Sequence, residues 1–73
     1  MKKTKENLIK IEGKDYVTLD VIEVLHETDS AVLFEHESGR KWVPKSQLED
    51  WPEIGDPGEI IITEWWATEK EWI

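Results

Sequence analysis

The alternation of apolar and polar positions over residues 30–48 is that of a β-hairpin. Residues 32–34 (Val-Leu-Phe) form an apolar, partly β-branched run, and residues 41–43 (Lys-Trp-Val) form a return strand. Pro44 ends that strand because proline cannot donate a hydrogen bond to the ladder. The sequence Glu-Ser-Gly between the two runs supplies the turn. The other apolar segments are short and would cover this hairpin.

The turn determines which residues face one another across the hairpin. We expect a three-residue loop with Gly39 in the left-handed conformation. Phe34 would then face Trp42, and Glu35 would face Lys41. Each of these cross-strand pairs would contribute about 0.2–1 kcal/mol. A two-residue loop would shift the register by one residue and lose both pairs.

The segments before the hairpin also predict strands. Residues 8–11 form a short edge strand that ends at Gly13, after a flexible basic tail over residues 1–7. Residues 15–27 form a long strand with a bulge near residues 22–23, where the apolar alternation slips by one position. Bent first strands of this kind are typical of small closed or half-open barrels.

After the hairpin, residues 45–58 predict an irregular connection. Ser46 would cap one helical turn over residues 47–51, which Pro52 ends. Residues 59–63 (Glu-Ile-Ile-Ile-Thr) are apolar on both faces, as is typical of a central strand. Two prolines and two glycines punctuate the connection and exclude a continuous strand or helix there.

A short C-terminal helix would begin at Glu64, with Thr63 as its cap. One stripe of this helix would close the sheet and would contain Trp65, Trp66, Glu69, Trp72 and Ile73. The predicted fold is therefore mainly β with a short C-terminal helix. It is a single domain over residues 8–73, built on a four- to five-stranded antiparallel sheet that is barrel-like or strongly bent.

The charge of the chain is negative and unevenly distributed. The formal net charge is −8, but residues 1–14 carry +3, because five lysines there oppose two glutamates. Residues 15–73 contain 15 acidic residues against four basic ones, a net charge of −11. A domain this acidic repels phosphate backbones, which disfavours nucleic-acid binding, and it would attract a basic surface on a protein partner. The alternative is that the acidity only keeps a small domain soluble.

Several protein classes are excluded by what the sequence lacks. The chain has no cysteine, so neither a disulfide framework nor a thiolate metal site can stabilise it. Its apolar runs are shorter than the roughly 18 residues of a membrane span, and its N-terminus has no apolar segment of a secretory signal. We expect a soluble cytoplasmic protein that does not associate with membranes.

No motif in the chain predicts catalysis or cofactor binding. A glycine-rich phosphate loop, a nucleophile elbow and a dinucleotide fingerprint are all absent from the sequence. A metal site would need His26, His36 and a carboxylate to converge, but Glu35 and Glu37 point to the opposite strand face from His36. We expect a non-enzymatic protein without cofactor or metal, and two ordinary histidines at exposed or half-exposed positions.

Five tryptophans are more than a core of this size readily hides. We expect Trp42 and one of the C-terminal pair in the core and at least one ring partly exposed, for which Trp51 and either Trp66 or Trp72 are the candidates. An exposed tryptophan beside carboxylates is typical of a protein-binding hot spot, although it could also lie over a sheet edge as a lid. The predicted protein-binding residues are Trp51, Glu53, Asp56, Glu64, Trp66 and Glu69.

Two other hypotheses remain open. The residues Lys41, Trp42, Lys45 and Gln47 would form an alternative face for single-stranded nucleic acid, on which the indole stacks a base. A homo-oligomer joined through the hydrophobic C-terminal helix is the third hypothesis.

Two motifs in the chain form a recognisable pattern. One is Trp-Val-Pro-Lys-Ser-Gln at residues 42–47, preceded by Ala-Val-Leu at residues 31–33, and the other is Glu-Trp-Trp-Ala-Thr-Glu-Lys at residues 64–70. Over residues 17–73 the chain resembles a group of small acidic proteins of phages and prokaryotic mobile elements. The resemblance implies such a source and transfers no catalytic residue. The corresponding hypothesis is an acidic inhibitor of a host nucleic-acid-handling or defence protein, such as a CRISPR nuclease.

Overall fold

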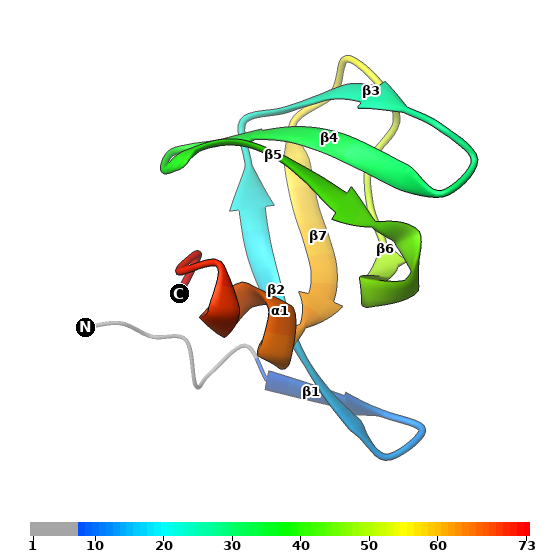
Figure 1. Cartoon of the computed structure of the whole chain (residues 1–73), viewed down its shortest axis with the longest axis vertical. Coiled ribbons are helices and arrows are strands. Elements are labelled where there is room, and N and C mark those ends of the chain that lie inside the picture. Colours follow the sequence, from blue (N-terminus) through cyan, green and yellow to red (C-terminus); the bar gives the residue numbers. More distant parts are fainter. Residues whose placement is uncertain (1–7) are drawn as a thin grey trace.

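The computed structural model describes residues 8–73 and contains two antiparallel sheets and one short helix in that range (Figure 1). The elements are β1 (Leu8–Ile11), β2 (Lys14–Val21), β3 (Glu23–Glu27), β4 (Ala31–His36), β5 (Gly39–Pro44), the 3-10 turn η2 (Lys45–Gln47), β6 (Leu48–Asp50), β7 (Gly58–Thr63) and α1 (Glu64–Glu69). Sheet A has the strand order β1-β2-β7-β6 and curls into a half-barrel, and sheet B has the order β3-β4-β5. The predicted fold class is confirmed. The predicted tail, residues 1–7, lies outside the described residues.

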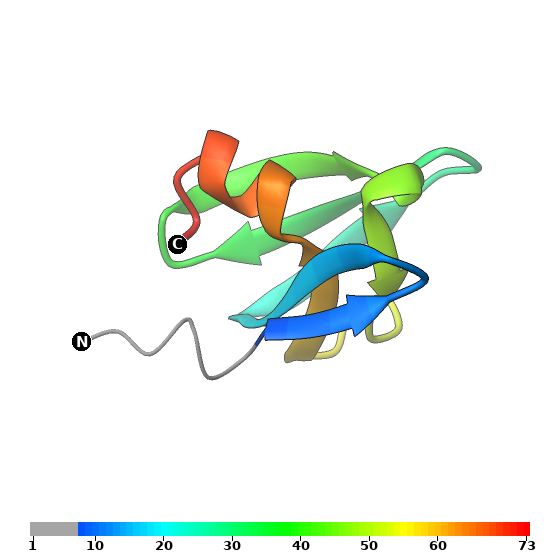
Figure 2. The same cartoon turned by 90° about the horizontal axis from the view of Figure 1, so that it is seen from below.

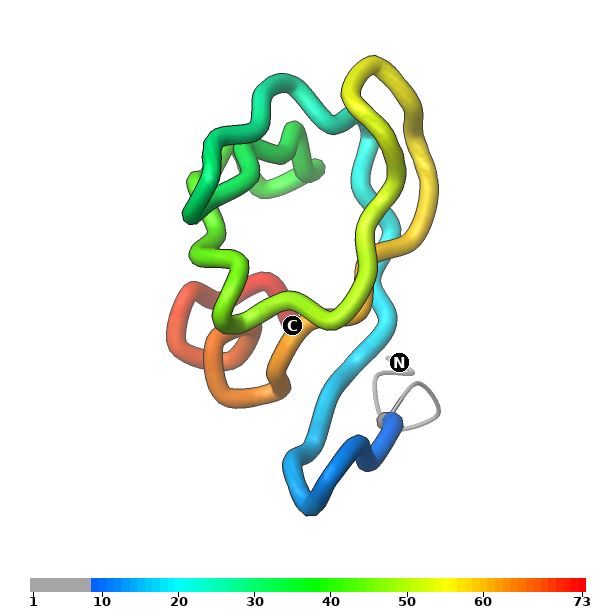
Figure 3. The backbone as a smooth tube through the Cα atoms, turned by 90° about the vertical axis from the view of Figure 1, so that its right-hand side faces the viewer, coloured from blue at the N-terminus to red at the C-terminus, as the bar shows by residue number. Residues whose placement is uncertain are grey.

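The two sheets are joined where the long second strand bends. The strand predicted over residues 15–27 breaks at Ile22, so that β2 lies in sheet A and β3 lies in sheet B. The N–H of Ile22 donates to the carbonyl of Glu35 at 2.8 Å, which fixes the bend against β4. A second irregularity follows between Val24 and His26, where the β3–β4 register shifts. The bend brings sheet B across sheet A, while the β1–β2 turn projects from the rest of the molecule (Figures 2 and 3).

One hydrophobic core lies between the inner faces of the two sheets. It contains side chains with no exposed surface from both sheets: Val17, Val24, Val32, Phe34, Val43, Ile60 and Ile62. The central position predicted for residues 59–63 is confirmed, because β7 pairs with both β2 and β6. The edge strand predicted over residues 8–11 is also confirmed, since β1 pairs only with β2 among the described strands.

The register of the β4–β5 hairpin differs from the prediction. Glu35 pairs with Arg40 and His36 pairs with Gly39, so the loop contains two residues instead of three. Gly39 does have a positive φ of 120°. The expected pairing of Glu35 with Lys41 does not form, and Arg40 takes that place with an Nε–Oε1 distance of 2.6 Å.

Burial explains why this register is preferred. It places Val32 opposite Val43, and both side chains are fully buried on the inner face of sheet B. It places Trp42 opposite Leu33, so the predicted Phe34–Trp42 pair is lost. Because a shift of one residue turns each side chain to the other face, the alternative register would expose one of the two valines. The observed register therefore fills the inner face with the valine and leaves the larger ring of Trp42 on the outer face, where it is 47% exposed.

The connection after β5 contains the other local difference. The helical turn is a 3-10 turn over Lys45–Gln47 that follows Pro44 directly, rather than a turn over residues 47–51 capped by Ser46. Leu48–Asp50 then continues as β6, in which Leu48 is buried and pairs with Ile62. The apolar side chain of Leu48 therefore gains more from pairing with β7 than from a helical turn at the surface.

The helix α1 begins as predicted but presents a different face. The hydroxyl of Thr63 accepts a hydrogen bond from the N–H of Trp66 at 3.3 Å, which confirms the cap. The buried helical residues are Trp66 and Ala67, whereas Trp65 is exposed. The predicted stripe is wrong because α1 ends at Glu69. Glu71, with a φ of 61°, then turns the chain so that Trp72 enters the core.

Candidate protein-binding surface

The five indoles divide into three classes of exposure. Trp66 and Trp72 are each only 5% exposed, Trp51 is half-buried, and Trp42 and Trp65 are 47% and 64% exposed. The expectation that the core cannot hide all five tryptophans is confirmed. The assignment of the rings is partly wrong, since Trp42 was expected in the core and Trp66 at the surface.

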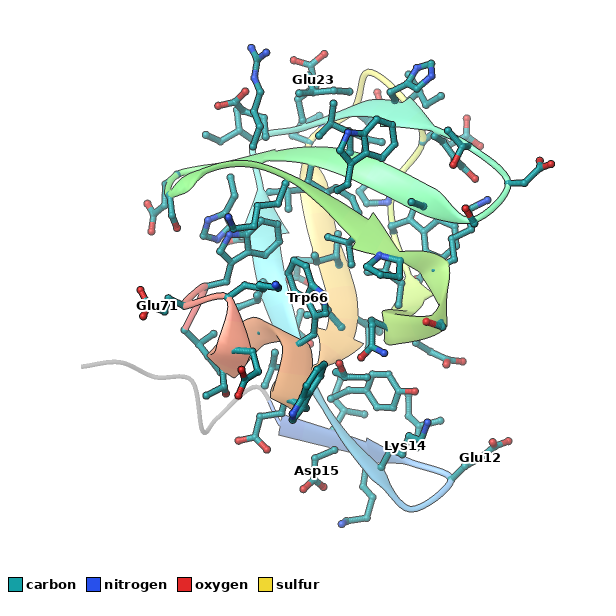
Figure 4. All side chains as sticks on the ribbon, viewed as in Figure 1. Glu12, Lys14, Asp15, Glu23, Trp66 and Glu71 are labelled. Atoms are coloured by element: carbon teal, nitrogen blue, oxygen red, sulfur yellow. The ribbon has the colours of Figure 1, made fainter. Side chains whose placement is uncertain are left out.

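Trp66 is a core residue and cannot anchor a partner. It points from α1 into the middle of the molecule (Figure 4), and its ring meets the ring of Trp72 edge-on at 5.3 Å between centroids. Successive residues of a helix are about 100° apart, so burying Trp66 turns the neighbouring Trp65 towards solvent. The sequence reasoning missed Trp65 as a candidate because α1 has six residues, too few to show which of two adjacent indoles faces the sheet.

An open groove lies beside Trp65, between α1 and the start of β2. We call it the α1 groove. Its volume is about 650 Å³, and it is lined by Lys14, Asp15, Gln47, Thr63, Glu64, Trp65, Thr68 and Glu69. Figure 4 shows Lys14 and Asp15 on the β1–β2 hairpin, below α1. Two of the predicted binding residues, Glu64 and Glu69, therefore lie in one groove with the most exposed indole of the chain.

Hydrogen bonds within the described residues hold the walls of the α1 groove in place. The hydroxyl of Thr63 donates to Oε1 of Gln47 at 2.6 Å while it caps α1, so one side chain connects η2 to the helix. On the opposite wall, Lys10 Nζ lies 2.9 Å from Asp15 Oδ1 in a pair that is exposed to water. The helix end is thus more firmly held than the hairpin, because exposed ion pairs contribute little.

The predicted residues Trp51, Glu53 and Asp56 lie elsewhere. They belong to the β6–β7 loop, at the other end of the molecule from α1 (Figure 1). Trp51 and Glu53 line a separate cavity of about 440 Å³, which shares no lining residue with the α1 groove. The backbone N–H of Asp56 donates to the carbonyl of Glu53, and its carbonyl accepts from Val24, so this loop is bound to β3. The six predicted residues therefore form no single surface.

Trp51 is engaged by residues of its own chain. Its Nε1–H donates to Oε1 of Glu27 at 3.4 Å, and Nζ of Lys45 lies 2.8 Å from the other oxygen of that carboxylate. The hydrogen bonds from Lys45 and then from Trp51 hold the pKa of Glu27 below its ordinary value. The Lys45 ammonium also lies 5.7 Å from the centroid of the Trp51 ring. These contacts match the lid hypothesis for Trp51 better than the hot-spot hypothesis.

The residues of the alternative nucleic-acid face are not brought together. Trp42 lies on the outer face of sheet B, where its ring meets His26 edge-on at 5.9 Å. Lys41 shares the inner side of β5 with Val43, because neighbouring residues of a strand point to opposite faces. Lys45 is held in the ion pair described above, and Gln47 lies in the α1 groove.

His36 occupies a different environment from the one expected. It is buried rather than exposed or half-exposed, and its ring stacks on Trp72 with centroids 4.3 Å apart and planes at 10°. Its Nδ1 accepts a hydrogen bond from the N–H of Ser38 at 3.1 Å, which requires Nδ1 to be unprotonated. Burial lowers the pKa of His36 below its ordinary value of 6.5, and the nearby Glu37 opposes this shift only in part.

We expect the protein to lose stability when the pH falls below the ordinary histidine pKa of 6.5. Because folding lowers the pKa of His36, the unfolded chain takes up the proton first, so the stability present above pH 6.5 is lost as the pH falls towards the folded pKa. Urea denaturation at a series of pH values measures this loss. His36→Phe retains a ring against Trp72 and is expected to flatten the profile, and His26→Gln serves as the matched histidine control. Equal slopes for both variants would contradict the assignment to His36.

Within residues 8–73, no helix is long and apolar enough to pass through a membrane. The same part of the chain contains no group of three or more His, Asp or Glu side chains placed to hold a metal ion. Among the described residues, the α1 groove combines the most exposed indole with several charged side chains. No protein-family model, curated protein or solved structure matches this chain.

Proposed function

We propose that this protein is a non-enzymatic interaction module that binds a basic surface of another protein through the α1 groove. The observation that carries the proposal is the indole of Trp65, which is 64% exposed in a groove that also contains three carboxylates. Tryptophan is enriched in binding hot spots because its large ring buries much area with few rotatable bonds. Leaving this ring in water costs free energy that contact with a partner would recover.

The charge of the domain supports a basic partner. Residues 15–73 carry a net charge of −11, and two of their four basic side chains, Arg40 and Lys45, are already paired with Glu35 and Glu27. A negative potential of this size accelerates encounter with a positive surface and repels acidic ones. Surfaces that bind nucleic acids are typically strongly basic and would fit this charge.

The biological form of the proposal follows from the resemblance in residues 17–73. A phage or mobile-element protein of this kind would act in the cytoplasm of the host. There it would inhibit a nucleic-acid-handling or defence protein, for example a CRISPR nuclease, by occupying the surface that the nucleic acid needs. Inhibition then requires no chemistry from this chain, only an affinity that competes with the nucleic acid.

A capture experiment with nucleic-acid competition tests the proposal. The purified protein is immobilised and exposed to a prokaryotic lysate at low salt, and the captured proteins are then challenged with a single-stranded or double-stranded oligonucleotide. We expect a nucleic-acid-binding protein to be released by the oligonucleotide. The double variant Glu64→Lys, Glu69→Lys is expected to capture none of it. The matched variant Glu23→Lys, Glu49→Lys has the same net charge, changes exposed residues outside the groove, and is expected to capture it normally.

Two outcomes would refute the proposal in favour of the other hypotheses. Direct, salt-sensitive binding of the oligonucleotide to this protein would support the single-stranded nucleic-acid accessory protein. Self-association detected by light scattering would support a homo-oligomer joined through α1 if Trp65→Ala dissociates the oligomer but does not abolish capture. A captured protein that stays bound at saturating oligonucleotide would contradict the competitive mechanism.

A further inference from the structure

We infer that the α1 groove is a receptor site for an arginine side chain of the partner. This inference rests on the proposed function and specifies the chemistry of its contact. The residues that carry it are Trp65, the three carboxylates of Asp15, Glu64 and Glu69, and the opposing ammonium of Lys14. They provide an open aromatic face and an excess of negative charge in one concave site.

Trp65 differs from the other four indoles in the neighbours of its ring. Trp42 and Trp72 each contact a histidine ring, Trp51 lies beneath the Lys45 ammonium, and Trp66 contacts both Trp72 and Lys70. Within residues 8–73, the ring of Trp65 has neither an aromatic nor a cationic neighbour of this kind. With 64% of its surface exposed, this ring is open to a planar cation.

The carboxylates of the groove are also open to an external partner. Glu64 and Glu69 make no side-chain hydrogen bond or ion pair with another described residue, although both line the groove with Trp65. Asp15 is paired with Lys10, but both side chains are exposed, and such a pair exchanges readily for a better one. With Lys14 as the opposing charge, the lining has three carboxylates against one ammonium, which disfavours phosphate and carboxylate ligands.

Arginine fits this site better than lysine does. A guanidinium group is planar and weakly hydrated, so it can stack on an indole while its edge donates two parallel hydrogen bonds to a carboxylate. Lysine presents a compact, strongly hydrated ammonium that cannot do both. The volume of about 650 Å³ exceeds that of one side chain and leaves room for the neighbouring residues of an exposed peptide segment.

The five indole N–H groups provide a direct test, because each gives a separate cross-peak in a ¹H–¹⁵N spectrum. The wild-type protein is titrated with acetyl-Gly-Arg-Gly-amide and, separately, with the peptides that contain citrulline or lysine in place of arginine. We expect saturable shifts of the Trp65 signal with the arginine peptide, at a dissociation constant in the millimolar range that suits one side chain. Citrulline has the shape of arginine without its charge and is expected to shift nothing. Glu64→Gln is expected to weaken binding about tenfold, whereas Glu49→Gln, a matched change on β6, is expected to have no effect.

Specific results would overturn the inference. Equal binding of the citrulline peptide would remove the role of charge, and equal binding of the lysine peptide would remove the selectivity for arginine. Larger shifts at Trp42 than at Trp65 would place the site on the outer face of sheet B. This titration needs no partner protein, so its failure alongside successful capture would refute only the arginine site. Failed capture with a successful titration would refute only the proposed function.

Discussion

Trp72→Ala is expected to lower the free energy of unfolding by about 3–5 kcal/mol, the usual cost of removing a buried aromatic ring. The indole is 5% exposed and closes the core between α1 and β4, where it stacks on His36 and meets Trp66 edge-on. Domains of this size are only marginally stable, so the loss is comparable to the whole stability of the fold. Urea denaturation followed by far-ultraviolet circular dichroism measures it without relying on tryptophan fluorescence.

Two variants make this result interpretable. Trp65→Ala removes the same side chain from the surface and is expected to change stability by less than about 0.5 kcal/mol. Trp72→Phe retains a ring against His36 and is expected to recover more than half of the loss. Trp72→Phe removes no hydrogen bond, since Nε1 of Trp72 has no partner among the described residues. Equal stabilities for Trp72→Ala and Trp65→Ala would contradict the placement of the C-terminal turn in the core.

The second large effect is expected in binding. Once a partner is identified by capture, Trp65→Ala is expected to weaken its affinity by about 30-fold or more, which corresponds to the loss of at least 2 kcal/mol at a hot spot. The matched variant is Trp42→Ala, which removes the other strongly exposed indole and is expected to change affinity less than about threefold. Isothermal titration calorimetry with both folded variants measures the difference. A larger loss for Trp42→Ala would move the interface to the outer face of sheet B.

Much of the fold could be predicted because it depends on local patterns. The run of three isoleucines at residues 60–62 identified a central strand, and Thr63 identified the start of α1. The phase slip near Ile22 marked the point where one strand leaves sheet A for sheet B. In each case the residues that determine the structure are neighbours in the sequence.

The incorrect predictions involve residues that are distant in the sequence or choices with nearly equal local energies. The β4–β5 register is decided by the burial of Val32 against Val43, which outweighs the local preference for a cross-strand aromatic pair. The return of Trp72 to the core depends on a positive φ at Glu71, a residue type that gives no sign of a left-handed turn. Two of the three carboxylates of the α1 groove, Glu64 and Glu69, were predicted and Asp15 was not, and the indole was misplaced by one residue, from Trp65 to Trp66.

The two hydrogen bonds of the Thr63 hydroxyl, one donated and one accepted, affect how mutational data on this protein are interpreted. Since its hydroxyl joins Gln47 to the first turn of α1, η2 and the helix form one connected wall of the groove. A substitution at Gln47 would remove the hydrogen bond that joins η2 to α1, so its effect on binding would combine a lost contact in the groove with any change in the position of the helix. Scanning by affinity alone would count Gln47 as an interface residue, and only a structural readout of the free variant would separate the scaffold from the contact.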